Sequence, residues 1–136
     1  MIKISDQPID IQACIEAAQS ERAGAVNVFI GTVRNHNKSK EVVRLEFETY
    51  DVMAVKKMEE LAKEAHERWN TEKIVMVHRK GVLAIGDVAV VIAVATPHRV
   101  ASFEACHWLI DTLKQVVPIW KKEIYENGEE WLEAHA

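Results

Sequence analysis

Hydrophobic residues recur along this chain with two different periods, and each period predicts a type of element. Apolar positions three and four residues apart predict helices over 10–19, 51–69 and 99–117. The apolar stripe expected on the last helix comprises Val100, Phe103, Cys106, Ile110, Leu113 and Val117. Pro118 should end that helix, because proline lacks an amide hydrogen and disfavours helical backbone at the preceding residue.

Four further segments have the composition of strands. They are 25–33, 42–50, 74–78 and 88–95. In the second, Val43, Leu45 and Phe47 should point to one face and the charged residues between them to the other. The last segment is apolar without interruption, which predicts a central strand covered on both faces.

The order of these elements predicts the fold class. Asn127-Gly128 indicates a two-residue hairpin turn within 121–132, and the polar stretch 35–40 is expected to be a loop. Helices interspersed with pairs of adjacent strands favour an α+β fold with a mixed or largely antiparallel sheet. We expect residues 1–136 to form a single domain with two long helices and a C-terminal hairpin.

The composition excludes several classes of protein. No apolar run is long enough to cross a membrane, and the start of the chain lacks a secretory signal, so a cytoplasmic location is expected. Cys14 and Cys106 both fall on apolar helix positions, where buried reduced thiols are expected. No zinc, dinucleotide or P-loop pattern occurs, and Glu104-x-x-His107 is best explained as the polar stripe of a helix.

Cations occur where apolar segments end, although the net charge is −4. Arg34 follows one predicted strand, and His98 and Arg99 follow another. Near the C-terminus, Lys114 and the pair Lys121-Lys122 flank Pro118. Taken singly, each has a structural explanation; a lysine in the last turn of a helix complements the helix dipole. Jointly they predict a local pocket for a small anion rather than a surface for nucleic acid.

Five short motifs, in order from about residue 23 to the C-terminus, resemble the catalytic large subunit of molybdopterin synthase. They are Gly31-x-Val33-Arg34-Asn35-His36-Asn37, His78-Arg79-x-Gly81, Gly86-Asp87, His98-Arg99-x-x-x-Phe103-Glu104-Ala105 and Leu113-Lys114-x-x-x-Pro118-x-Trp120-Lys121-Lys122-Glu123. The resemblance implies an α/β-hammerhead fold. It also implies an enzyme that converts cyclic pyranopterin monophosphate to molybdopterin by inserting two sulfurs.

The resemblance further implies partners. The sulfur would come from a small ubiquitin-like carrier subunit whose Gly-Gly terminus is a thiocarboxylate, and the large subunit would be a homodimer within a heterotetramer. No cofactor or metal would be needed. Two buried cysteines suit this scheme, because an enzyme that carried its own sulfur would need a reactive thiol on a loop.

The resemblance also assigns roles to residues at the substrate. Arg34, with the backbone around Thr32 and Val33, would bind the substrate. His98 and Arg99 would hold its phosphate from the neighbouring protomer. Thr32 stands where some relatives carry lysine, so a side-chain charge is missing at that position.

The remaining roles fall on the C-terminal motif. Lys114 would be the principal catalytic lysine, close to the carrier's tail, and Lys121 would assist it. Lys121, Lys122 and Glu123 would line the pterin end of the pocket. Both substrates are anionic, and fixed cations favour their approach. We expect Lys114 chiefly to stabilise charge, although roles as nucleophile or base stay open.

Two other classes of function fit some of these features. A non-enzymatic module that binds a phosphorylated metabolite would use the same cations without chemistry. A nucleic-acid binder would use the basic stretch 35–40, but the acidic total charge disfavours it.

Overall fold

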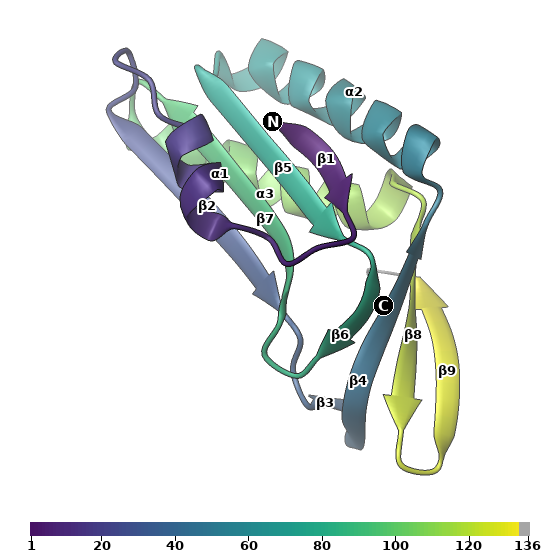
Figure 1. Ribbon diagram of the computed structural model, residues 1–136. Helices are drawn as coiled ribbons and strands as arrows, with labels where there is room; N and C mark the ends of the chain where they lie inside the picture. The colour runs from purple at the N-terminus through teal and green to yellow at the C-terminus, as the bar shows by residue number, and fades with distance from the viewer. Residues whose placement is uncertain (134–136) are drawn as a thin grey trace.

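The structure, a computed structural model, describes residues 1–133 and contains two sheets and three helices (Figure 1). The elements in chain order are β1 (Ile2–Ser5), α1 (Ile11–Ala17), β2 (Ala25–Thr32), β3 (His36–Asn37), β4 (Lys40–Thr49), α2 (Asp51–Trp69), β5 (Lys73–Arg79), β6 (Gly81–Ala84), β7 (Val88–Thr96), α3 (Arg99–Val116), β8 (Ile119–Tyr125) and β9 (Gly128–Glu133). The predicted helices and strands are all present, and the α+β class is confirmed.

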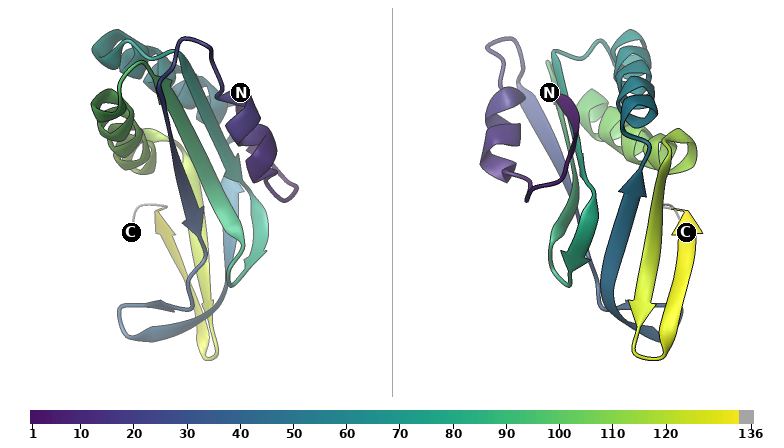
Figure 2. Two further views of the ribbon diagram at one scale, coloured as in Figure 1. Left: turned by 90° about the vertical axis from the view of Figure 1, so that its left-hand side faces the viewer. Right: turned by 45° about the vertical axis from the view of Figure 1, so that its right-hand side comes forward.

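The first sheet has the strand order β1-β5-β7-β2, with β1 parallel to β5 and the other pairs antiparallel. Helices α2 and α3 lie on one face and α1 lies on the other (Figure 2). Alternate residues of β7 therefore enter two cores: Ile92 packs in the cluster that includes α2 and α3, and Val91 packs with Cys14 of α1. This confirms the prediction that 88–95 is covered on both faces.

The second sheet is built on β4, which is long enough to pair with β3, β6 and β8, all antiparallel. The β8–β9 hairpin forms its outer side, with the turn at Asn127-Gly128 as predicted. Figure 1 shows β4, β8 and β9 extending beyond the helices. Helix α3 leads directly into β8, because Val117 leaves the helical conformation just before Pro118.

Three short strands were missed. β1, β3 and β6 have four residues or fewer. Such lengths carry almost no periodicity, so they form only because a longer strand lies beside them. β3 lies inside the segment that we expected to be a loop, and it pairs with the start of β4.

The alternation predicted for β4 was wrong at Val43. Leu45 and Phe47 are buried as expected, but Val43 is exposed and Val42 is buried in its place. The register between β4 and β8 shifts between Val42 and Arg44, which marks a β-bulge. A bulge inserts one residue into the strand and exchanges the faces on either side of it.

The stripe predicted for α3 was wrong in its first two turns. Val100 and Phe103 are 62% and 61% exposed, whereas Ser102 and Ala105 face the core. Small residues on the inner face let the helix approach the sheet closely. Cys106, Ile110 and Leu113 are buried as predicted. The first half of α3 therefore leaves two large apolar side chains uncovered.

Both cysteines are buried thiols, as predicted. His107 pairs with Asp111 along the exposed side of α3, with 3.1 Å between Nε2 and the carboxylate. Among residues 1–133, no helix is both long and apolar enough to cross a membrane.

Candidate active site

A narrow cavity of about 120 Å³ lies where α3 meets both sheets. Its lining comprises Phe29, Gly31, Thr32, Leu45, Phe47, His78, Ala89, Val90, Ile110, Leu113, Lys114 and Lys121. Most of these side chains are apolar, and the charged ones are two lysines. Because apolar walls weaken solvent screening, a charge placed here acts more strongly than it would in water.

The two lysines reach the cavity from different elements. Lys114 comes from the last turn of α3 and Lys121 from β8, directly after the Pro118 junction. Burial lowers the pKa of Lys121; the charge of Glu123 opposes this shift, and the charges of Lys114, Arg34 and Lys38 add to it. The structure thus brings together three of the predicted cations, and Lys38 joins them.

The end of β2 places Arg34. Val33 is 3% exposed, and its backbone is bound on both sides: its N–H donates to the Asp87 carbonyl (3.0 Å), and its own carbonyl accepts from the Gly86 N–H (2.7 Å). These bonds fix the point at which the chain leaves the sheet, so Arg34 begins the next segment in a defined place. The Val33 backbone, expected to bind substrate, is therefore already engaged within the fold.

Gly31 leaves room for the side chains of Val90 and Phe29 in the wall of the cavity. A Cβ atom at this position would lie 2.6 Å from Cγ1 of Val90 and 3.3 Å from the Phe29 ring. The register between β2 and β7 also shifts between Gly31 and Thr32. Thr32 lines the cavity and is exposed, so this residue lies at the mouth.

Glu123 lies beside the cavity rather than in its lining. The residue is only 2% exposed. Its carboxylate accepts two bonds from Nδ2 of Asn37 (3.0 and 3.1 Å) and one from the Tyr125 hydroxyl (2.5 Å), and it lies 3.9 Å from Nζ of Lys121. Protein groups therefore engage this carboxylate on several sides.

Lys122 points away from Lys121, because successive side chains of a strand alternate between faces. Its ammonium lies 3.8 Å from Glu46 and 3.7 Å from Glu129, and over the ring of Trp131. Lys121 and Glu123 pair with Phe47 and Leu45 on the inner face of the sheet. We expected Lys121, Lys122 and Glu123 to lie together. Within one chain, Lys121 and Glu123 lie on the inner face of the sheet and Lys122 lies on the other face.

His98 and Arg99 lie at the opposite end of α3 from Lys114. Both are exposed, and His98 is the residue that precedes the first turn. At ~1.5 Å per residue, Arg99 and Lys114 are about 22 Å apart along the helix axis. One chain therefore does not bring these two cations to one small anion.

His78 is a site residue that the sequence analysis did not single out, beyond its place in a motif. It lies near the end of β5, is 4% exposed and lines the cavity. Burial lowers its pKa to about 4, although its bond to the Arg79 carbonyl opposes the shift; the charge of Lys114 adds to the lowering. The only sequence signal at this position was a histidine close to the end of a predicted strand, and no spacing to other residues marked it.

Comparison with known proteins decides the family. The model of the family described as MoaE protein matches residues 4–116. The molybdopterin synthase catalytic subunit of Halalkalibacterium halodurans is 49% identical over 129 residues, covering 95% of this chain and 83% of that protein. The chain belongs to the MoaE family.

Solved structures agree with this family assignment. The crystal structure of molybdopterin synthase from Staphylococcus aureus has a TM-score of 0.93 at 41% identity, covering 96% of both chains. A more distant structure from Helicobacter pylori, a complex of subunits 1 and 2 of molybdopterin-converting factor, has the same fold, with a TM-score of 0.78 at 24% identity. MoaE relatives are named as catalytic subunits, so this chain is a member of an enzyme family.

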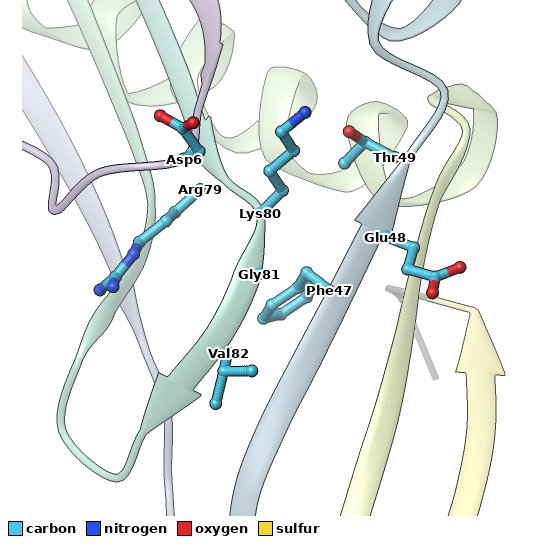
Figure 3. A pocket seen from close by; sticks show the side chains of 8 residues that line it. All are labelled: Asp6, Phe47, Glu48, Thr49, Arg79, Lys80, Gly81 and Val82. Carbon is cyan, nitrogen blue, oxygen red and sulfur yellow. The ribbon is translucent and has the colours of Figure 1, made fainter.

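A second hollow, which shares Phe47 with the cavity, is larger but chemically different (Figure 3). It has a volume of about 420 Å³ and lies between β4, β6 and the segment after β1. Its two cations are already paired, Lys80 with Asp51 and Arg79 with Asp87. The smaller cavity of this MoaE chain differs in that its lining contains two lysines and no acidic residue.

Proposed function

We propose that this chain converts cyclic pyranopterin monophosphate to molybdopterin, taking two sulfurs from the thiocarboxylate terminus of a small carrier subunit. The observation that carries the proposal is that Lys114 and Lys121 line one cavity, with the charge of Arg34 acting on Lys121, in a protein of net charge −4. Membership of the MoaE family supports it.

The charge of the cavity suits a reaction between two anions. A phosphorylated pterin and a thiocarboxylate repel each other in water, and fixed cations between them offset that repulsion. Lysine is a compact charge on a flexible stem, so Lys114 and Lys121 can follow negative charge as it moves between sulfur and the acyl oxygen. We assign Lys114 this electrostatic role.

The size of the cavity favours the carrier's tail as its occupant. A volume of about 120 Å³ is several times that of a water molecule, at about 30 Å³ in the liquid, and well below that of sites for drug-sized ligands. An extended Gly-Gly terminus has no side chains and suits a narrow space. The bulkier pterin would then lie across the mouth, beside Thr32 and Arg34.

The uncovered side chains at the start of α3 support a homodimer. Val100 and Phe103 are exposed directly beside His98 and Arg99, and β2 forms an open edge of the sheet nearby. Large apolar side chains in such a position favour contact with another copy. A neighbouring protomer would then supply its His98 and Arg99 to the phosphate, and we place the complex in the cytoplasm.

Reconstitution tests this proposal. The purified chain is mixed with a thiocarboxylated Gly-Gly carrier and cyclic pyranopterin monophosphate, and the dithiolene product is measured. We expect product in proportion to the carrier consumed, at two carriers per pterin. A carrier ending in an ordinary carboxylate is the matched control. Tight binding of the pterin without product would favour the non-enzymatic binding module instead.

A further inference from the structure

A buried carboxylate connects two parts of the site that are far apart in sequence. Glu123 belongs to β8, and Asn37 belongs to the short strand β3. The Asn37 amide nitrogen lies 3.0 and 3.1 Å from the two carboxylate oxygens of Glu123. An amide nitrogen has two hydrogens, so Asn37 can donate to both oxygens at once. Hydrogen bonds to a charged acceptor are stronger than those between neutral groups.

Asn37 stands within a segment that carries cations of the site. Arg34 precedes it and Lys38 follows it, and the charges of both act on Lys121. The segment 34–40 is mostly exposed, and β3 pairs with β4 at only two positions. The bond from Asn37 to Glu123 therefore joins this exposed segment to the buried face of β8.

The backbone of the same segment needs such support. Lys38 and Ser39 connect β3 to β4 with φ values of 50° and 70°, a left-handed conformation that glycine or asparagine adopts more easily. Residues other than glycine hold this conformation only where their surroundings fix it. The residue that directly precedes this turn is Asn37.

Glu123 is already occupied by protein groups. Besides Asn37, it accepts a hydrogen bond from Tyr125 and faces the Lys121 ammonium at 3.9 Å. It does not line the cavity. The carboxylate thus serves as a fixed point between the 34–40 segment and Lys121.

We propose that Asn37 is a positioning residue for sulfur transfer: by donating to Glu123, it holds the 34–40 segment so that Arg34 and Lys38 converge with Lys121. The inference rests on the proposed function for its effect on catalysis. Its structural part, the attachment of the segment to β8, stands independently of the reaction.

The test replaces Asn37 with aspartate, which has nearly the same shape but loses both donors and repels Glu123. We expect KM for cyclic pyranopterin monophosphate to rise about tenfold or more, because the cations that face the substrate are no longer held. Amide hydrogen exchange should accelerate in residues 34–40 and stay unchanged in α2. Asn35→Asp is the matched control, since it adds the same charge to the same segment at a side chain that hydrogen-bonds to His36 rather than to Glu123.

A swapped pair provides the second variant. Asn37→Asp combined with Glu123→Gln restores an amide–carboxylate bond with the donor on β8, and it keeps one negative charge beside Lys121. We expect this double variant to return KM most of the way to the wild-type value. Amide exchange in residues 34–40 should become slow again. If Asn37→Asp does not fold, the double variant decides: slow exchange with near wild-type KM supports the inference, and a folded double variant with fast exchange and raised KM overturns it.

The outcomes separate this inference from the proposed function. If the unmodified protein yields no dithiolene, the proposed function fails, and the exchange data alone test the attachment of the segment. If the unmodified protein is active while Asn37→Asp matches Asn35→Asp in both KM and exchange, the positioning role of Asn37 is overturned.

Discussion

The imidazole of His78 lies edge-on to the ring of Phe47, with ring centroids 5.1 Å apart and planes at 72°. Its Nδ1 lies 2.8 Å from the Arg79 carbonyl oxygen, so a proton on Nδ1 satisfies that contact. With its pKa lowered to about 4 by burial, the ring is neutral at physiological pH. The positive charge in the lining of the cavity therefore belongs to its lysines alone.

This neutral histidine predicts how stability depends on pH. In the unfolded chain His78 takes up a proton below about pH 6.5, whereas in the folded chain it does so only near pH 4. The unfolded state thus binds more protons in this window, and stability falls as pH falls from about 6.5 to about 4. Over this pH range, His78 should lower the free energy of unfolding by about 3 kcal/mol.

Urea denaturation between pH 7 and pH 4 measures this effect. His78→Gln should have a flatter pH dependence than the unmodified protein, whatever its stability at pH 7. His107→Gln is the control, because that ring is exposed on α3. If the free energy of unfolding changes equally with pH in the unmodified protein and in His78→Gln, His78 does not contribute to the pH dependence of stability.

Neighbouring lysines on β8 should differ sharply in effect. Lys121 lines the cavity, whereas Lys122 pairs with Glu46 and Glu129 on the other face. Lys121→Ala should reduce kcat/KM for sulfur insertion about a hundredfold, the size expected when a group that stabilises developing charge is removed. Lys122→Ala should reduce kcat/KM far less. Equal losses in steady-state assays of the two variants would contradict the placement of Lys121.

Neither cysteine should carry the transferred sulfur. Burial raises the pKa of the Cys106 thiol to about 11 and also raises the pKa of the Cys14 thiol, so both stay protonated and unreactive. We expect Cys106→Ala to lower stability by about 1–2 kcal/mol and to keep sulfur insertion per folded molecule. Single-turnover assays on folded protein measure this. Loss of insertion in a well-folded variant would identify Cys106 as part of the chemistry.

A mixing experiment tests whether a neighbouring copy completes the site. Lys114→Ala and Arg99→Ala should each be nearly inactive alone. In a mixed dimer, one site would contain both substitutions and the other neither. Random mixing should therefore restore about a quarter of the unmodified activity. Mixtures that stay as inactive as their components would show that Arg99 does not act on a site across the dimer.

The long elements were predictable because their patterns are local. Helix 51–69 repeats one period over many residues, strand 88–95 is apolar throughout, and the hairpin at Asn127-Gly128 depends on two residues alone. The failures at Val43 and Phe103 have tertiary causes. A bulge exchanges the faces of β4, and an uncovered helix end leaves Phe103 exposed. Neither a bulge nor a missing neighbour changes the apolar pattern itself.

The candidate site was predictable only in part. Arg34, Lys114 and Lys121 were found because cations after apolar segments stand out, and the structure brings them together. Lys121 and Lys122 lie on opposite faces because they are successive residues of a strand, but which of them faces the cavity depends on the pairing with β4. His78 was missed because a single histidine within a strand has no spacing to mark it.

The central claim is that Lys114 acts on the transition state between two anions and not merely on binding. Its most direct test measures substrate affinity and single-turnover dithiolene formation for the unmodified protein and for Lys114→Ala, with thiocarboxylated carrier present. We predict a rate loss of about a hundredfold or more, with pterin affinity changed less than about tenfold. An unchanged rate in Lys114→Ala, or a loss confined to affinity, would contradict the account.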